Sequence, residues 1–232
     1  MKKLILMVFM GICILGAKAQ IITEQDFAAI DMSQFDTDGD GKVKDKEAAL
    51  AIKELYGLDK DNGITRVTVI DSIPKTKEQI YIAVNDWFIR SFNDGKSVVQ
   101  LNDKEAGCVI GKGFIGNMGS TQAFFTNSKI GAYVIIRVDI KEGRMRITTT
   151  IQEYEMLKGT GTGMQVLGAL SGARVDNNVS LVKFIPSQCF PFTNEQKKEG
   201  AKGFVKGHIY SLICINKLRE AVFNGIAGND DW

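Results

Sequence analysis

A twelve-residue stretch of the sequence, residues 36–47, carries acidic side chains at the spacing of an EF-hand calcium loop. In such a loop, carboxylates occupy positions 1, 3 and 5, a glycine allows the sharp turn at position 6, and a glutamate at position 12 binds through both oxygens. Position 7 contributes only its backbone carbonyl, so the type of its side chain does not matter. The sequence therefore predicts a Ca²⁺ site whose ligands are Asp36, Asp38, Asp40, Lys42 and Glu47.

The other charges of this loop favour weak binding. Position 9 is Lys44, which cannot act as a ligand, so a water molecule is expected in that direction. The loop has a net charge of −2, and we expect a dissociation constant on the order of 10⁻⁴ M, as in extracellular modules. Residues 59–63 begin like a second loop but are too short, and we interpret them as a turn. An unpaired loop favours a structural clip over a sensor. The alternative is a solvated acidic turn between helices.

Three other patterns that could do chemistry have simpler interpretations. Gly111, Gly113 and Gly116 match the spacing of a dinucleotide-binding loop, but no helix is expected to begin there, so they are interpreted as bends in a strand. His208 has no metal-ligand residue types at helical spacing around it and is interpreted as a packed or capping residue. No serine or threonine lies in a recognised nucleophile motif. We therefore expect that the protein is not an enzyme.

The N-terminus predicts export. Residues 1–19 combine a basic start, a short apolar run and small residues before a cleavage point, which is the pattern of a signal peptide. Its removal takes away three lysines and turns the formal charge of +2 into −1, which excludes a nucleic-acid partner because phosphate neutralisation needs a basic surface. No later segment is apolar enough to span a membrane. The expected location is the periplasm or the exterior. Cys108, Cys189 and Cys214 remain, in an undetermined redox state.

Hydrophobic periodicity predicts an α+β fold with four parts. The parts are the signal peptide (1–19), an EF-hand helix–loop–helix (20–58), an α+β domain (64–157), and a Gly-rich loop followed by a long helix (158–232). Within the first helical part, helices are expected over 23–35 and 47–56, and within the last over 193–223. Within the α+β domain, a strand over 64–73 precedes a helix that a Thr76–Gln79 capping box begins. Further strands are predicted over 97–101, 108–114, 122–126, 132–140 and 144–153, which argues for an antiparallel sheet with a packed helix.

The central part of the chain also resembles a known family. Tyr81 and Trp87 on the predicted helix, the turn at 103–107, Gly111, and the hairpin at 141–146 together resemble a Bacteroidetes family of exported proteins of unknown function with a TBP-like fold. The resemblance covers roughly residues 64–157. It implies a curved antiparallel sheet crossed by a helix, and it implies no catalytic or binding residue.

These observations lead to one main functional expectation. We expect an exported calcium-binding protein that acts as a non-enzymatic interaction module, whose partner is a protein, a peptide or an envelope component engaged through the sheet face or the long helix. The alternative is a cell-envelope enzyme or enzyme inhibitor with an unrecognised site in the α+β domain. A third possibility is a purely structural role, in which calcium rigidifies the junction between the two parts.

Overall fold

The computed structural model describes residues 26, 29–36, 38–91, 99–123, 126–160, 179–188, 190 and 198–225. Its strands form one seven-stranded antiparallel sheet in the order β1-β2-β6-β5-β4-β3, with β7 also paired to β6. The strands are β1 (Gly57–Leu58), β2 (Ile64–Ile70), β3 (Val99–Asp103), β4 (Cys108–Ala123), β5 (Thr126–Lys141), β6 (Arg144–Thr160) and β7 (Val179–Phe184). The helices are η1 (Ser33–Phe35), α2 (Asp45–Ile52), η2 (Lys53–Leu55), α3 (Lys77–Ser91), η3 (Pro186–Gln188) and α6 (Lys198–Asn224).

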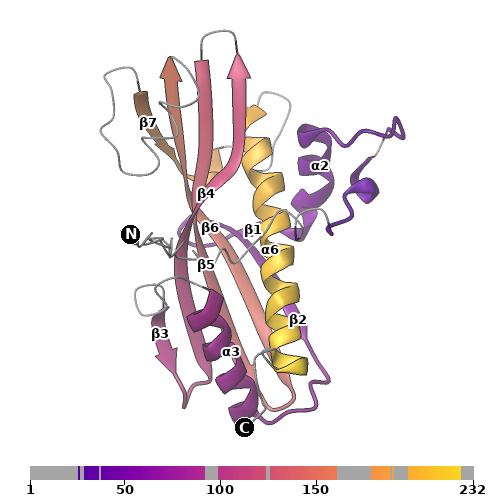
Figure 1. Ribbon diagram of the computed structural model, residues 1–232, viewed down its shortest axis with the longest axis vertical. Helices are drawn as coiled ribbons and strands as arrows, with labels where there is room; N and C mark the ends of the chain where they lie inside the picture. Colours follow the sequence, from indigo (N-terminus) through magenta and orange to yellow (C-terminus); the bar gives the residue numbers. More distant parts are fainter. Residues whose placement is uncertain are drawn as a thin grey trace, which may run out of the picture.

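Three long strands, β4, β5 and β6, form the centre of the sheet (Figure 1). Gly143 adopts a positive φ of 64° in the turn between β5 and β6, where a side chain would be strained. Irregularities in register interrupt the pairing of β4 with β5 between Ile115 and Gly119 and the pairing of β5 with β6 between Tyr133 and Val134. Such irregularities increase the local twist, in keeping with the strongly twisted sheet of Figure 1.

Helix α3 packs on the same side of the sheet as α6 (Figure 1). Its start is the predicted capping box, because the Gln79 N–H donates to Thr76 Oγ1 (3.3 Å) and the Thr76 N–H donates to Gln79 Oε1 (3.0 Å). The buried face of α3 consists of Ile80, Val84, Trp87 and Phe88, at helical spacing. The predicted helix is therefore confirmed, together with its cap.

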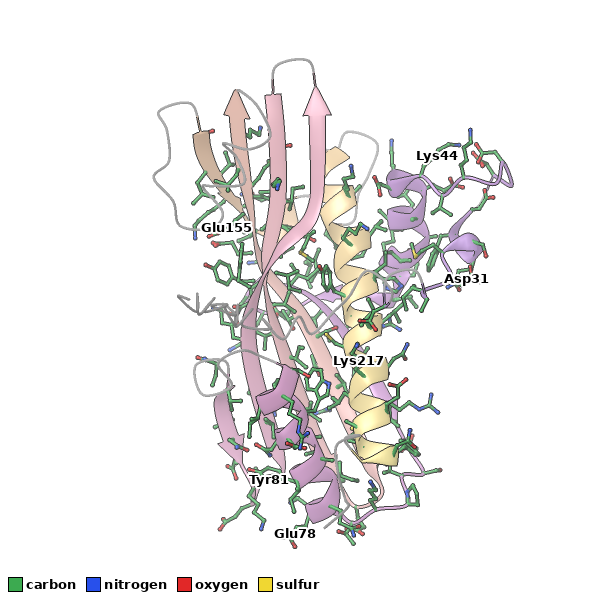
Figure 2. The ribbon with its side chains drawn as sticks, in the orientation of Figure 1. Asp31, Lys44, Glu78, Tyr81, Glu155 and Lys217 are labelled. Carbon is green, nitrogen blue, oxygen red and sulfur yellow. The ribbon has the colours of Figure 1, made fainter. Side chains whose placement is uncertain are left out.

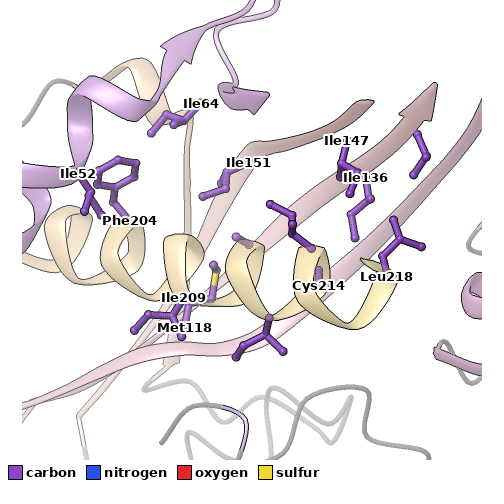
Figure 3. Close-up of a cluster of buried hydrophobic side chains, with 14 of the residues drawn as sticks. Ile52, Ile64, Met118, Ile136, Ile147, Ile151, Phe204, Ile209, Cys214 and Leu218 are labelled. Atoms are coloured by element: carbon purple, nitrogen blue, oxygen red, sulfur yellow. The ribbon is translucent and has the colours of Figure 1, made fainter. Parts of the chain in front are cut away.

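Helix α6 completes the hydrophobic core along most of its length (Figure 3). It packs against β4, β5 and β6 on one side and against α2 on another. Phe204 and Leu218 are fully buried, near the two ends of the helix. One core therefore joins the N-terminal helix, the sheet and the C-terminal helix.

The segment before the acidic loop differs from its prediction. The expected helix over 23–35 does not continue to its end, because residues 29–32 are non-helical and only the short η1 follows. The Asp31 carboxylate accepts hydrogen bonds from both the backbone N–H (2.9 Å) and the hydroxyl (2.6 Å) of Ser33. Such a local turn competes with the helix for the backbone donors.

Several other boundaries also differ. The predicted strand over 108–114 is the first part of the longer strand β4, the one over 122–126 covers the end of β4 and the first residue of β5, and β7 was not predicted. Gly57 lies in β1 and does not end the second helix, which begins at Asp45 instead of Glu47. The predicted signal peptide (1–19), most of the Gly-rich loop and the beginning of the 193–223 helix lie outside the described residues, and α6 is described from Lys198.

Candidate metal site

The acidic loop lies between η1 and α2, on the side of α6 that faces away from the sheet (Figures 1 and 2). Gly39 and Gly41 both have positive φ angles, 72° and 77°. A Cβ atom at either position would meet nothing within 4 Å, so the requirement for glycine comes from backbone conformation and not from lack of space. These two residues curl the chain so that the side chains of Asp36, Asp38 and Asp40 point toward one another.

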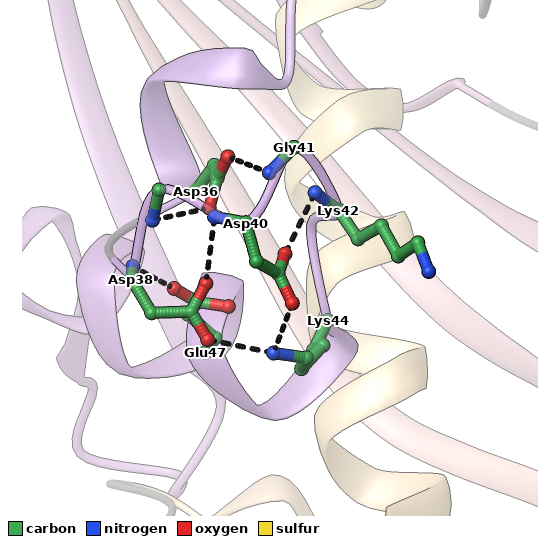
Figure 4. A network of polar contacts seen from close by, with 8 residues as sticks. Asp36, Asp38, Asp40, Gly41, Lys42, Lys44 and Glu47 are labelled. Carbon is green, nitrogen blue, oxygen red and sulfur yellow. Dashed lines mark hydrogen bonds and ion pairs between the residues drawn. The ribbon is translucent and has the colours of Figure 1, made fainter.

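Three carboxylates converge inside the curl (Figure 4). One oxygen from each of Asp36, Asp38 and Asp40 lies within 4.8 Å of the others. Backbone N–H groups of the loop donate to these carboxylates and orient them: Gly39 and Gly41 to Asp36 (2.9 and 2.8 Å), Asp40 to Asp38 (3.2 Å), and Lys42 to Asp40 (2.9 Å). The carboxylates are therefore held toward one point, where like charges would otherwise separate.

Glu47 reaches back to the loop from the first turn of α2. Its Oε1 accepts a hydrogen bond from the Asp38 N–H (2.9 Å), and its Oε2 is shielded from solvent. Because α2 packs on α6 through the buried side chains of Ala49 and Ile52, the backbone that carries Glu47 is fixed against the core. The glutamate thus lies at the base of the loop, as the EF-hand spacing predicts.

Lys44 forms ion pairs with two of the three carboxylates. Its Nζ lies 2.6 Å from Asp38 Oδ2 and 2.9 Å from Asp40 Oδ2. The hydrogen bond from Lys44 lowers the pKa of Asp38, and the same pairing raises the pKa of Lys44. Sequence spacing excluded Lys44 as a ligand, but it gave no sign that this ammonium would occupy the mouth of the loop.

Lys42, the remaining predicted ligand, is the only one expected to bind the ion through its backbone carbonyl. Its side chain points away from the carboxylates in Figure 4, and its N–H donates to Asp40. The loop therefore brings Asp36, Asp38 and Asp40 together, with Glu47 joined to them through the Asp38 amide.

The donor set suits a hard cation. All the candidate side-chain ligands are carboxylates, and carboxylate and carbonyl oxygens favour Ca²⁺ or Mg²⁺ over zinc or copper, which prefer nitrogen and sulfur. Curved loops that offer several oxygens from flexible positions suit Ca²⁺ better than Mg²⁺, which requires a near-octahedral shell. The residues present fit calcium by their chemistry.

A second polar cluster, which the sequence did not predict, joins α6 to the N-terminal helical segment (residues 33–58) and to β2. His208 is only 2% exposed. Its Nδ1 lies 2.9 Å from the Tyr56 hydroxyl and 3.4 Å from Arg66 Nη1. The interpretation of His208 as a packed residue is therefore confirmed, but its polar partners come from distant parts of the chain.

The structure also places the glycines and cysteines that the sequence analysis singled out. Gly111 and Gly113 lie within β4, and a Cβ atom at Gly111 would come within 2.4 Å of the Phe88 ring. Both glycines therefore lie in a strand, as interpreted, and Gly111 also makes room for the Phe88 ring of α3. Cys108 and Cys214 are free and buried, and Cys189 lies outside the described residues. No helix in the described part of the chain is long and apolar enough to cross a membrane.

Comparison with known proteins gives the fold class. Residues 67–155 match the sequence profile of a domain of unknown function (DUF4468) with a TBP-like fold. The match spans most of the sheet and α3, and it supports a TBP-like α+β fold. The comparison brings no activity with it, and no curated protein matches the sequence.

Two solved structures are similar in shape. One is a TBP-like protein from Parabacteroides distasonis, with 10% identity and a TM-score of 0.45, which covers 73% of this chain and 95% of its own. The other is a DUF4468 family protein from Bacteroides ovatus, with 10% identity and a TM-score of 0.42, which covers 77% of this chain and 94% of its own.

Proposed function

We propose that residues 36–47 bind one Ca²⁺ ion and that the protein is an exported, non-enzymatic interaction module. The observation that carries the proposal is the convergence of Asp36, Asp38 and Asp40 within 4.8 Å in a loop closed by two glycines of positive φ. Glu47 at the base of the loop and the carbonyl of Lys42 would complete an all-oxygen ligand set.

Lys44 sets the expected strength of binding. Its ammonium already neutralises Asp38 and Asp40 in part, so a cation has to displace it from both carboxylates. This competition supports a dissociation constant on the order of 10⁻⁴ M. It also supports a structural clip, because the ammonium keeps the loop closed at low calcium concentration.

The test is a calorimetric calcium titration of the purified protein. We expect one ion per chain, and we expect Asp36→Ala to abolish the heat of binding. The matched control is Asp45→Ala, which removes an acidic residue of the same loop that is not a predicted ligand, and it should retain most of the affinity. Equal heats for the wild type and Asp36→Ala would refute the calcium site.

The partner is proposed to bind the outer face of the sheet. Lys112 and Phe114 alternate with Gly111, which faces α3, so both side chains project from the opposite face. There Phe114 is 41% exposed and packs on Tyr133, over whose ring the Lys112 ammonium lies. Helix α6 is the weaker choice because most of its residues are buried. Pull-down from envelope extract, with and without calcium, should recover a partner from the wild type and less from Phe114→Ser.

A further inference from the structure

Within the contact between residues 33–58 and α6, the buried imidazole of His208 bonds to two residues that lie far from it in the sequence. His208 lies on α6, Tyr56 follows η2, and Arg66 lies on β2. The Tyr56 hydroxyl and Arg66 Nη1 both approach the same nitrogen, Nδ1, at 2.9 and 3.4 Å. The Nδ1 atom of His208 therefore links α6 to Tyr56 and to β2.

The same imidazole also contacts the beginning of the acidic loop. The ring of Phe35, which directly precedes Asp36, stands edge-on to His208 with centroids 5.7 Å apart. The Tyr56 ring packs at 5.0 Å against Phe204, one turn earlier on α6. Phe35 and Tyr56 thus bracket the loop and α2, and both ends of this segment rest on His208.

The hydrogen bonds define the protonation state of the imidazole. An arginine N–H can only donate, so Nδ1 must accept and the ring proton must lie on Nε2. A proton on Nδ1 would face the guanidinium directly and would require the Tyr56 hydroxyl to accept instead of donate. Protonation is therefore unfavourable in this arrangement.

The charged surroundings of His208 do not compensate for such a proton. Arg66 of β2 is the charged group that acts on the imidazole, and it is positive. Tyr56 presents a hydroxyl, and η1 presents the Phe35 ring. No carboxylate in the described part of the chain contributes to the shift. Burial first, and Arg66 second, lower the pKa of His208 from 6.5 to about 4.

We propose that His208 is a pH-sensitive latch that holds residues 33–58 on α6 when it is neutral and releases them when it is protonated. Because its pKa is lowered in the folded protein, the latch is fully closed above pH 6.5 and opens as the pH falls through about 4. The released segment is the one that carries the acidic loop. The latch does not depend on calcium binding.

The experiment uses the fact that His208 is the one histidine of the chain, so its NMR signal is unambiguous. The imidazole is titrated between about pH 7.5 and about pH 3.5, and amide exchange of residues 45–58 is followed in parallel, corrected for intrinsic rates. We expect His208 to titrate well below 6.5, and protection of residues 45–58 to fall progressively between pH 6.5 and about 4, at least tenfold in all. Amides of β5 and β6 should keep their protection through that transition.

Variants separate this latch from the titration of carboxylates. His208→Gln keeps an acceptor without a titratable group, so it should keep protection of residues 45–58 across the range. Tyr56→Phe keeps the ring but removes the hydroxyl, so the pH at which His208 is half protonated should rise. This variant tests the latch if His208→Gln does not fold. The latch is refuted if His208 titrates near 6.5 without loss of protection, or if His208→Gln loses protection over the same pH range as the wild type.

Discussion

At the acidic loop, one lysine and any bound cation compete for the same carboxylates. Lys44 pairs with Asp38 and Asp40, so replacing it with glutamine removes the competitor and one positive charge. We predict that Lys44→Gln tightens calcium binding roughly tenfold, because affinity in such loops follows the charge of the ligand set. Calorimetric titration at fixed ionic strength measures the change.

Lys42→Gln is the matched control for that variant. It makes the same change of charge at a side chain that points away from the carboxylates (Figure 4). We expect its effect to be about twofold, from the general field of the loop alone. Equal effects of the two variants would mean that the ion pairs of Lys44 do not oppose the cation.

The residues of the loop could be predicted from the sequence because their relation is local. The carboxylates, the two glycines and Glu47 lie within twelve consecutive positions, and the turn geometry that unites them follows from residue type. The contact between His208 and Tyr56 could not be predicted, because the two residues are 152 positions apart and no pattern relates them. Lys44 shows an intermediate case, in which its position was noticed but its ion pairs were not.

At the scale of elements, the contact between α3 and β4 depends on Gly111, which has no side chain to block it. A Cβ atom at Gly111 would lie 2.4 Å from Phe88 Cε1, and Phe88 is fully buried. The ring has no free direction in which to move, so we predict that Gly111→Ala lowers the free energy of unfolding by about 1–3 kcal/mol. Urea denaturation followed by circular dichroism gives the difference.

Gly57→Ala controls for the general effect of adding a methyl group to a strand. Gly57 lies in β1, and a Cβ atom there meets nothing within 4 Å. Its unfolding free energy should stay within about 0.5 kcal/mol of the wild type. If both variants behaved alike, the close approach of α3 to the sheet would not be a constraint on position 111.

Elements with strong periodicity and explicit caps were predicted well, and those that depend on long-range pairing were not. The box at Thr76 fixed the start of α3, whereas β4 was divided because its glycines resemble strand breaks. Those glycines are tolerated because β5 pairs along most of the strand and α3 and Phe114 cover them. Strand β7 was missed because its pairing with the end of β6 is set by the fold and not by local sequence.

At the scale of the molecule, the acidic loop is attached to a segment that shares the main core. Phe35 and Ile52 belong to the same buried cluster as the sheet and α6. Calcium should therefore stabilise the whole fold: at about 10 mM, roughly 100 times the expected dissociation constant, the gain is about 2.7 kcal/mol. We predict a rise in Tm of roughly 5–10 °C, measured by calorimetry, in one transition.

The same scan on Asp36→Ala should give no rise, and chelation should reverse the rise in the wild type. At pH 7, where His208 is neutral, two separate transitions with only the smaller one responding to calcium would show that residues 33–58 unfold on their own. That result would contradict the single core and leave the binding site itself intact.

The packing of the N-terminal helical segment on the C-terminal helix also has a consequence for the order of folding. Residues 33–56 leave the ribosome long before their partner His208, which follows Tyr56 by 152 residues. At ordinary rates of synthesis this delay is roughly eight to thirty seconds. During that interval α6 is not yet available to cover Phe35 and Ile52. The segment is therefore synthesised early but can pack on α6 only late. Until then it is accessible to chaperones and proteases.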